Sequence, residues 1–214
     1  MRCLGLDPSL TNFGWAVHDT AFPVGDRSRC DIRGRFQTST RTLFIDRYTD
    51  LRERLGALVA EHKPDKVGLE FPVFNDLWSE GMYGLFLYTC ESLKLAKQDV
   101  VFWSPMQVKA HARESLGRPP GWKMMKPDMI DAARADTGGG RWNHNEADAY
   151  LVARLASRFW LIHEGEILER DLSDVERKYF LDIKRYERGK KAGKVDLKGV
   201  MYREDDRFFL WSKE

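Results

Sequence analysis

The chain has 214 residues, of which 43% are hydrophobic and 32% charged, and its formal net charge is +2. A chain of this length can bury one sizeable core, so we expect a single main domain. The sequence has no run of about 18 apolar residues and no signal-peptide pattern, which argues against a membrane protein and predicts an intracellular one.

The predicted order is three strands, then helix, strand, helix, strand and several helices. An apolar strand ends at Asp7, a second strand at 14–17 returns through a short hairpin, and a third is expected within 30–39. Crossover helices imply parallel strand pairing, whereas the hairpin is antiparallel, so this order predicts an α/β fold with a mixed sheet. The later predicted elements are helices at 43–62, 80–97, 106–116, 126–135 and 144–160, and strands at 66–70 and 100–103.

The region after about residue 171 differs in character from the rest of the chain. We expect a charged helix, a loop rich in glycine and lysine, and a hairpin, which together form an appendage to the core. Seven Lys or Arg residues stand against two acids between positions 184 and 198. Such a local excess could follow a phosphate backbone, although a solvated surface would give the same pattern.

Three carboxylates occupy unusual positions. Asp7 and Glu70 each close an apolar strand, and Asp148 lies inside an apolar helix, on one face with His144 and Asn145. Functional sites in open α/β sheets tend to lie at one end of the strands, and like charges held close together need a cation. The pattern therefore predicts a metal site, with three unrelated turn, capping or surface acids as the alternative.

Several segments resemble a known family. The stretches GLDPSLTNFGWAV, VGLE, WSPMQVK (103–109) and NEADA, with a lysine at position 126, resemble the RuvC-like Holliday junction resolvases, specifically the phage-type members within the RNase H-like superfamily. The resemblance covers about residues 1–160. It implies an RNase H-like mixed five-stranded sheet flanked by helices, which we assign to residues 1–165. The pattern of the tail itself, outside the resemblance, predicts a small basic C-terminal appendage of helix and hairpin over 166–214.

The same resemblance implies a function. It predicts a crossover junction endodeoxyribonuclease that binds branched DNA and resolves four-way junctions by two-metal-ion phosphodiester hydrolysis. We expect a homodimer, because two symmetric cuts need two active sites. The expected location is the cytoplasm of a bacterial or bacteriophage-infected host.

The resemblance also assigns roles to residues. It implies that Asp7, Glu70 and Asp148 bind two Mg²⁺ or Mn²⁺ ions. Many members carry a further acid three or four residues before the last Asp, where this chain has Asn145 and His144. The fourth ligand stays open: Asn145 is a candidate metal ligand, and His144 a candidate ligand or catalytic group that positions the attacking water. The residues expected to contact DNA are Phe74, Lys109, Lys126, Lys184, Arg185, Lys190, Lys191 and Lys194.

Three other readings are possible. An actin-like ATPase also places Asp7 before a polar turn, and the triple glycine at 138–140 imitates its second phosphate loop. The chain is short for that two-lobed fold, and a helix stands where the ATPase needs a strand. A related RNase H-like nuclease acting on RNA or on other branched substrates, and a non-catalytic nucleic-acid-binding module, remain as alternatives.

Overall fold

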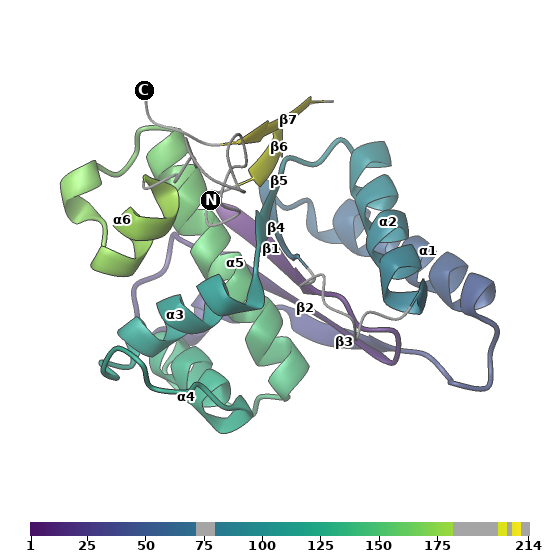
Figure 1. Ribbon diagram of the computed structural model, residues 1–214, viewed down its shortest axis with the longest axis horizontal. Coiled ribbons are helices and arrows are strands. Elements are labelled where there is room, and N and C mark those ends of the chain that lie inside the picture. The colour runs from purple at the N-terminus through teal and green to yellow at the C-terminus, as the bar shows by residue number, and fades with distance from the viewer. Residues whose placement is uncertain (72–79, 182–200, 205–206, 211–214) are drawn as a thin grey trace, which may run out of the picture.

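The computed structural model describes residues 1–71, 80–181, 201–204 and 207–210 (Figure 1). Their strands form one mixed sheet in the order β3-β2-β1-β4-β5-β6-β7. An antiparallel meander of β1 (Arg2–Asp7), β2 (Asn12–Asp19) and β3 (Arg33–Gln37) begins it. Parallel pairing then adds β4 (Lys66–Glu70) and β5 (Val100–Trp103), and antiparallel pairing adds β6 (Met201–Glu204) and β7 (Arg207–Leu210).

Helices cover both faces of the sheet (Figure 1). On one face lie α1 (Phe44–His62) and α2 (Glu80–Leu95). On the other face lie α3 (Pro105–Ser115), α4 (Lys126–Thr137), α5 (His144–His163) and α6 (Asp174–Phe180). Two short 3-10 helices, η1 (Arg27–Cys30) and η2 (Glu169–Asp171), lie in the connections. Among the residues that the structure describes, no helix combines the length and apolar character that a bilayer crossing requires.

Alternate residues of each central strand enter two separate cores. Leu4 and Leu6 of β1 pack with the α1 and α2 side chains, whereas Cys3 of the same strand joins the core beneath α5. Since both faces are covered, the central strands read as nearly continuous apolar runs. A polar residue on such a strand is therefore exceptional.

Glycines on three neighbouring strands let α5 approach the sheet closely. A Cβ atom added to Gly5 would lie 2.0 Å from the carbonyl oxygen of Ala149, and one added to Gly14 would lie 2.2 Å from that of Asn145. At Gly68 the added atom would lie 2.6 Å from the Ala156 Cβ. These distances are shorter than any van der Waals contact, so only glycine fits beneath the helix. The backbone of α5 thus rests directly on β1, β2 and β4.

Most predicted elements are confirmed, including the mixed sheet. The third strand begins later than position 30 because Arg27–Cys30 form a 3-10 turn, whose start is capped by the Asp26 carboxylate accepting from the Ser28 N–H at 2.8 Å. Gly138, with φ of 70°, ends α4 in the left-handed conformation. The glycine triplet is therefore a helix stop after a helix, unlike the strand-to-loop arrangement of an ATPase.

The described parts of the C-terminal tail pack against the core more closely than the prediction of an appendage implies. The predicted hairpin exists, but β6 pairs with β5 and so adds two strands to the expected five. Phe180 of α6 is fully buried and lies 5.6 Å from the Trp103 ring, centroid to centroid. Without β6, the β5 strand would present an unpaired edge, which proteins generally cover.

Candidate active site

Strand register brings the first two carboxylates together. β1 and β4 are parallel, with Leu6 opposite Leu69, so Asp7 and Glu70 close adjacent strands at the same end of the sheet. Side chains two positions apart share a face of a strand. Because Gly5 lies under α5, Asp7 points to the α5 face, and Glu70 does so by the same relation to Gly68. The Gly-x-acid spacing on both strands is the sequence signal for this shared face.

The third carboxylate comes from α5. The Asn143 side chain caps this helix by accepting from the Asn145 N–H at 2.9 Å, which fixes where the helix begins. The helix backbone then meets Gly14 at Asn145 and Gly5 at Ala149. Asp148 is held between these two contacts, within electrostatic range of both strand carboxylates.

The three acids share one poorly solvated region. Burial raises the pKa of Glu70 to about 8, with a further contribution from the Asp148 charge. Burial also raises the pKa of Asp148 to about 6. The pKa of Asp7 lies well above its ordinary value because of burial and then of its two carboxylate neighbours. Ionising all three carboxylates in this arrangement costs free energy unless a cation is present.

Two lysines supply part of the positive charge that offsets the three carboxylates. Lys109 of α3 lowers the pKa of Glu70 and of Asp148, and Lys126 at the start of α4 lowers the pKa of Asp7 and of Asp148. Both lysines are residues expected to contact DNA, and the structure places them within electrostatic range of the carboxylates. Their ammonium groups also suit the non-bridging oxygens of a phosphodiester.

The donor set fits Mg²⁺ or Mn²⁺, which prefer carboxylate oxygens. Across the described ranges, no three His, Cys, Asp or Glu side chains lie close enough to enclose one ion. Mg²⁺ is commonly held by one or two carboxylates, with water and substrate phosphate completing its shell, so a set of three carboxylates does not need to enclose an ion to bind it.

His144 and Asn145 begin α5 beside the acids. His144 is partly exposed, and its pKa is lowered by burial and then by the charges of Lys126 and Arg35. Asn145 is buried, with its carbonyl against Gly14. Arg35 of β3 did not figure among the predicted site residues. Its nearness to His144 depends on β3 pairing at the edge of the sheet, which local sequence does not reveal.

The remaining predicted DNA contacts lie outside the described residues. Phe74 belongs to the segment 72–79. The basic cluster of the tail belongs to the segment 182–200; its members are Lys184, Arg185, Lys190, Lys191 and Lys194.

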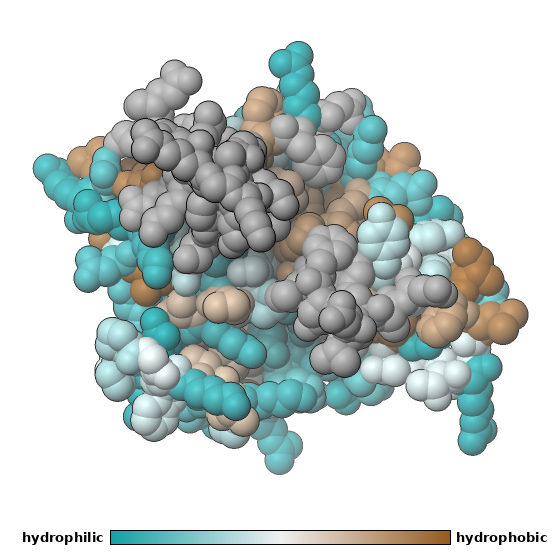
Figure 2. Space-filling model, viewed as in Figure 1, coloured by the Kyte–Doolittle hydropathy of each residue, from teal (hydrophilic) through white to brown (hydrophobic). Residues whose placement is uncertain are grey.

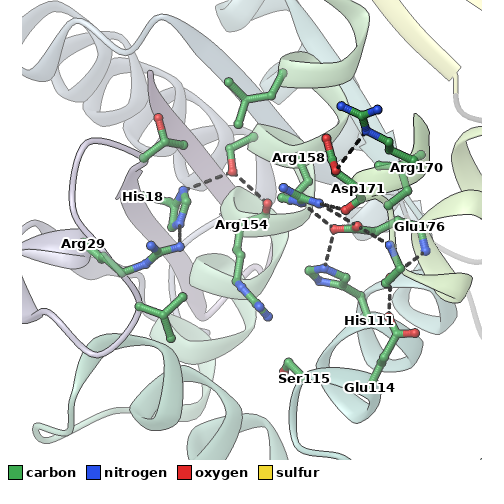
Figure 3. Close-up of a pocket in the computed structure, with 16 residues that line it drawn as sticks. His18, Arg29, His111, Glu114, Ser115, Arg154, Arg158, Arg170, Asp171 and Glu176 are labelled. Carbon is green, nitrogen blue, oxygen red and sulfur yellow. Dashed lines mark hydrogen bonds and ion pairs between the residues drawn. The ribbon is translucent and has the colours of Figure 1, made fainter. Parts of the chain in front are cut away.

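A cavity of about 610 Å³ lies apart from the carboxylates, between the second half of α5 and the elements α3, α6 and η1 (Figure 3). Its charged groups are largely paired, either with one another or, for Arg29 and Arg154, with Asp136 nearby. Glu176 accepts from Arg158 at 2.8 Å and lies 3.2 Å from the His111 ring nitrogen, and these hydrogen bonds lower its pKa well below the usual range despite burial. The cavity wall is therefore a polar network that fastens α6 to α3 and α5.

Comparisons with known proteins agree with this geometry. No family model matches the chain. Two proteins named crossover junction endodeoxyribonuclease RuvC are similar in sequence: that of Gloeobacter violaceus is 41% identical over 73 residues, and that of Paramagnetospirillum magneticum is 33% identical over 75 residues. These matches span 33% and 35% of this chain, and only 39% and 43% of the two relatives.

Two solved structures are similar in fold. A structure of Thermus thermophilus RuvC in complex with Holliday junction substrate matches with a TM-score of 0.59 and 18% identity. A second Thermus thermophilus RuvC structure has the same TM-score and 20% identity. Each match covers 77% of this chain and 97% of the other chain. The chain therefore has the RuvC fold, within the RNase H-like architecture, and shares sequence with RuvC over the matched segment.

Proposed function

We propose that this chain is a metal-dependent endonuclease that resolves four-way DNA junctions. The observation that carries the proposal is the meeting of Asp7, Glu70 and Asp148 on one face of a RuvC-like sheet, with two lysines beside them. Similarity to RuvC in both sequence and fold supports the same substrate class.

Each residue then has a role. Asp7, Glu70 and Asp148 would hold two divalent ions, which when bound would supply the activation of water and the charge stabilisation that phosphodiester hydrolysis needs. Lys109 and Lys126 orient the scissile phosphate. Because the pKa of His144 is lowered, its imidazole is neutral near pH 7 and can take a proton from the attacking water. Asn145 supports the metal site from the buried side of α5.

The sequence supports further DNA contacts and a two-part chain. Phe74 would stack on bases at the junction centre, and the basic cluster of the tail would follow the phosphate backbone. Residues 1–165 would form the nuclease domain. Residues 166–214 would form an extension whose described parts pack against that domain.

We propose a homodimer, so that two active sites can make two symmetric cuts. Large hydrophobic side chains are exposed on α1 and α2 and just before α1, and Figure 2 shows hydrophobic residues gathered at that end of the molecule. They are Leu43, Phe44, Ile45, Tyr83 and Leu87. An apolar surface of this kind is typical of an interface between subunits. Sedimentation of wild type and Leu87→Glu would test it, with loss of the dimer expected in the variant.

The decisive experiment is a nuclease assay on a synthetic four-way junction, a linear duplex, an RNA–DNA hybrid and a flap, with Mg²⁺, Mn²⁺ or EDTA. We expect metal-dependent cutting of the junction. Asp7→Asn, Glu70→Gln and Asp148→Asn should each abolish cutting and keep junction binding, because affinity comes mostly from contacts to phosphate. Asp50→Asn, which removes an exposed α1 carboxylate paired with Arg54, is the matched control.

The substrates separate the alternatives. Preferred cutting of the RNA–DNA hybrid would assign the chain to RNA-directed nucleases of the same fold. Junction binding without cutting in either metal would leave a non-catalytic binding module.

A further inference from the structure

The loop between α3 and α4, residues 116–125, presents an aromatic side chain to solvent. Trp122 is 44% exposed, which is unusual for the largest hydrophobic ring. Two residues later, Met124 is only 6% exposed and belongs to the core beneath α5. The loop is therefore anchored by Met124, and the exposure of Trp122 does not reflect a loose segment.

The backbone of this loop is tightly constrained. Gly117 and Gly121 adopt φ of 62° and 87°, a region that other residues rarely enter. Between them, two consecutive prolines at 119 and 120 limit the chain further. The Trp122 N–H donates to the Pro119 carbonyl at 3.1 Å. Trp122 is thus presented on a preformed turn, which lowers the entropy lost when a ligand stacks on it.

The charged residues of the loop itself are all positive, although the Asp128 carboxylate accepts from the Met125 N–H at its end. The Arg118 guanidinium lies 5.0 Å from the centre of the indole ring. Arg118, Lys123 and Lys126 carry positive charge, and the sequence from 115 to 127 contains no acid. A ring combined with such cations suits an anionic ligand that also has flat aromatic groups, which is the chemistry of a nucleic acid strand.

The loop leads directly into the candidate active site. Trp122 precedes Lys126 by four residues, so their Cα atoms are at most about 14 Å apart. Lys126 in turn acts electrostatically on Asp7 and Asp148. Since bases in a strand follow one another at about 3.4 Å, this length of backbone corresponds to about four base steps, and we expect a base stacked on Trp122 to lie a few nucleotides from a phosphate held by Lys126.

We propose that Trp122 and Arg118 form a stacking platform for an unpaired base of the DNA strand that passes through the active site. This inference rests on the proposed function. The platform lies on the α3–α4 side of the site, whereas Phe74 belongs to the segment that follows β4. The two aromatic residues would hold the substrate from different parts of the chain.

The test is junction binding in EDTA, with 2-aminopurine placed one to four nucleotides from the cut. We expect Trp122→Ala to weaken binding about 5- to 150-fold, as loss of one stacked base would, and to abolish the change in fluorescence. Trp122→Phe should keep most of both signals. Phe22→Ala, which removes an exposed ring from another loop, should bind as wild type does.

Salt dependence separates stacking from charge. Trp122→Ala should keep the wild-type slope, whereas Lys123→Ala should reduce it by up to about 0.9 per lost phosphate contact. Wild-type binding and fluorescence in Trp122→Ala would overturn the inference while leaving the nuclease proposal in place. An equal loss on fully paired linear duplex would also overturn it. A wild-type protein that neither binds nor cuts junctions would instead refute the proposed function.

Discussion

Replacing Gly5 by alanine tests whether the closeness of α5 to the sheet positions the catalytic groups. The added Cβ would lie 2.0 Å from the Ala149 carbonyl oxygen, whereas ordinary contact begins near 3.4 Å, so the helix must move by about 1.4 Å. Ala149 adjoins Asp148, and this carboxylate would move with it. A misplacement of about 1 Å can cost about 100-fold in rate. We expect at least that loss in cutting.

The cost in stability should be of similar size, because a 100-fold loss in rate corresponds to about 2.7 kcal/mol. Overpacking of this kind typically costs about 1–3 kcal/mol, which most single domains survive. Gly56→Ala is the matched control, because nothing lies within 4 Å of a Cβ added there. Its position inside α1 should bring a gain of about 1 kcal/mol and unchanged cutting.

The assay combines single-turnover cleavage of a four-way junction with urea unfolding and junction binding. Gly5→Ala should fold, bind the junction and cut it slowly. A Gly5→Ala protein that cuts at the wild-type rate would refute the view that direct backbone contact sets the position of Asp148. Unfolding of Gly5→Ala in the absence of urea would refute the estimate of the packing cost.

Three further predictions concern the charged groups. Lys126→Ala should slow cutting more than it weakens binding, because it removes a charge beside Asp7; equal cutting by the variant, measured in single turnover, would exclude Lys126 from the site. Because the pKa of Glu70 rises from 4.5 to about 8, the metal-free protein should lose stability as the pH rises through this interval, and Glu70→Gln should remove that part of the loss. Urea titrations in EDTA at several pH values should show a larger loss of stability in the wild type than in Glu70→Gln. The same pH dependence of stability in both proteins would contradict the prediction. Because the pKa of His144 is lowered, wild-type cutting should decline only below about pH 6.5, more steeply than in His144→Asp. An active His144→Ala with an unchanged pH profile would eliminate the imidazole, and loss only in Asn145→Ala would assign the role to the amide.

The strand-end acids were predictable because two local signals coincide. Apolar runs locate the strands, and the crossover helices imply that β1 and β4 are parallel, so acids at their ends share one edge of the sheet. Lys109 was predicted from the resemblance to a known family, and the structure adds its electrostatic effect on Glu70. The resemblance to a known family gave the order of these segments.

Other features depend on long-range packing that local sequence does not reveal. The pairing of β6 with β5 joins residues about 100 positions apart, and only the assembled sheet has an edge at β5. The nearness of Arg35 to His144 also depends on long-range strand pairing, so local sequence does not predict it. The exposure of Trp122 is also invisible in sequence, since a tryptophan in a loop can equally be buried. Phe74 remains a sequence-based prediction.

The order of strands also bears on how two copies can associate. Among the described strands, β3 and β7 lie at the edges of the sheet, and each is short. Arg33 and Arg35 are two residues apart and so lie on the same face of β3. A second β3 strand placed beside this one would bring like charges together on that face. Such edges resist the strand addition by which sheets fuse and aggregate. A dimer of this chain would therefore keep its two sheets separate and meet through helices, which leaves the carboxylate end of each sheet free to receive its own DNA strand.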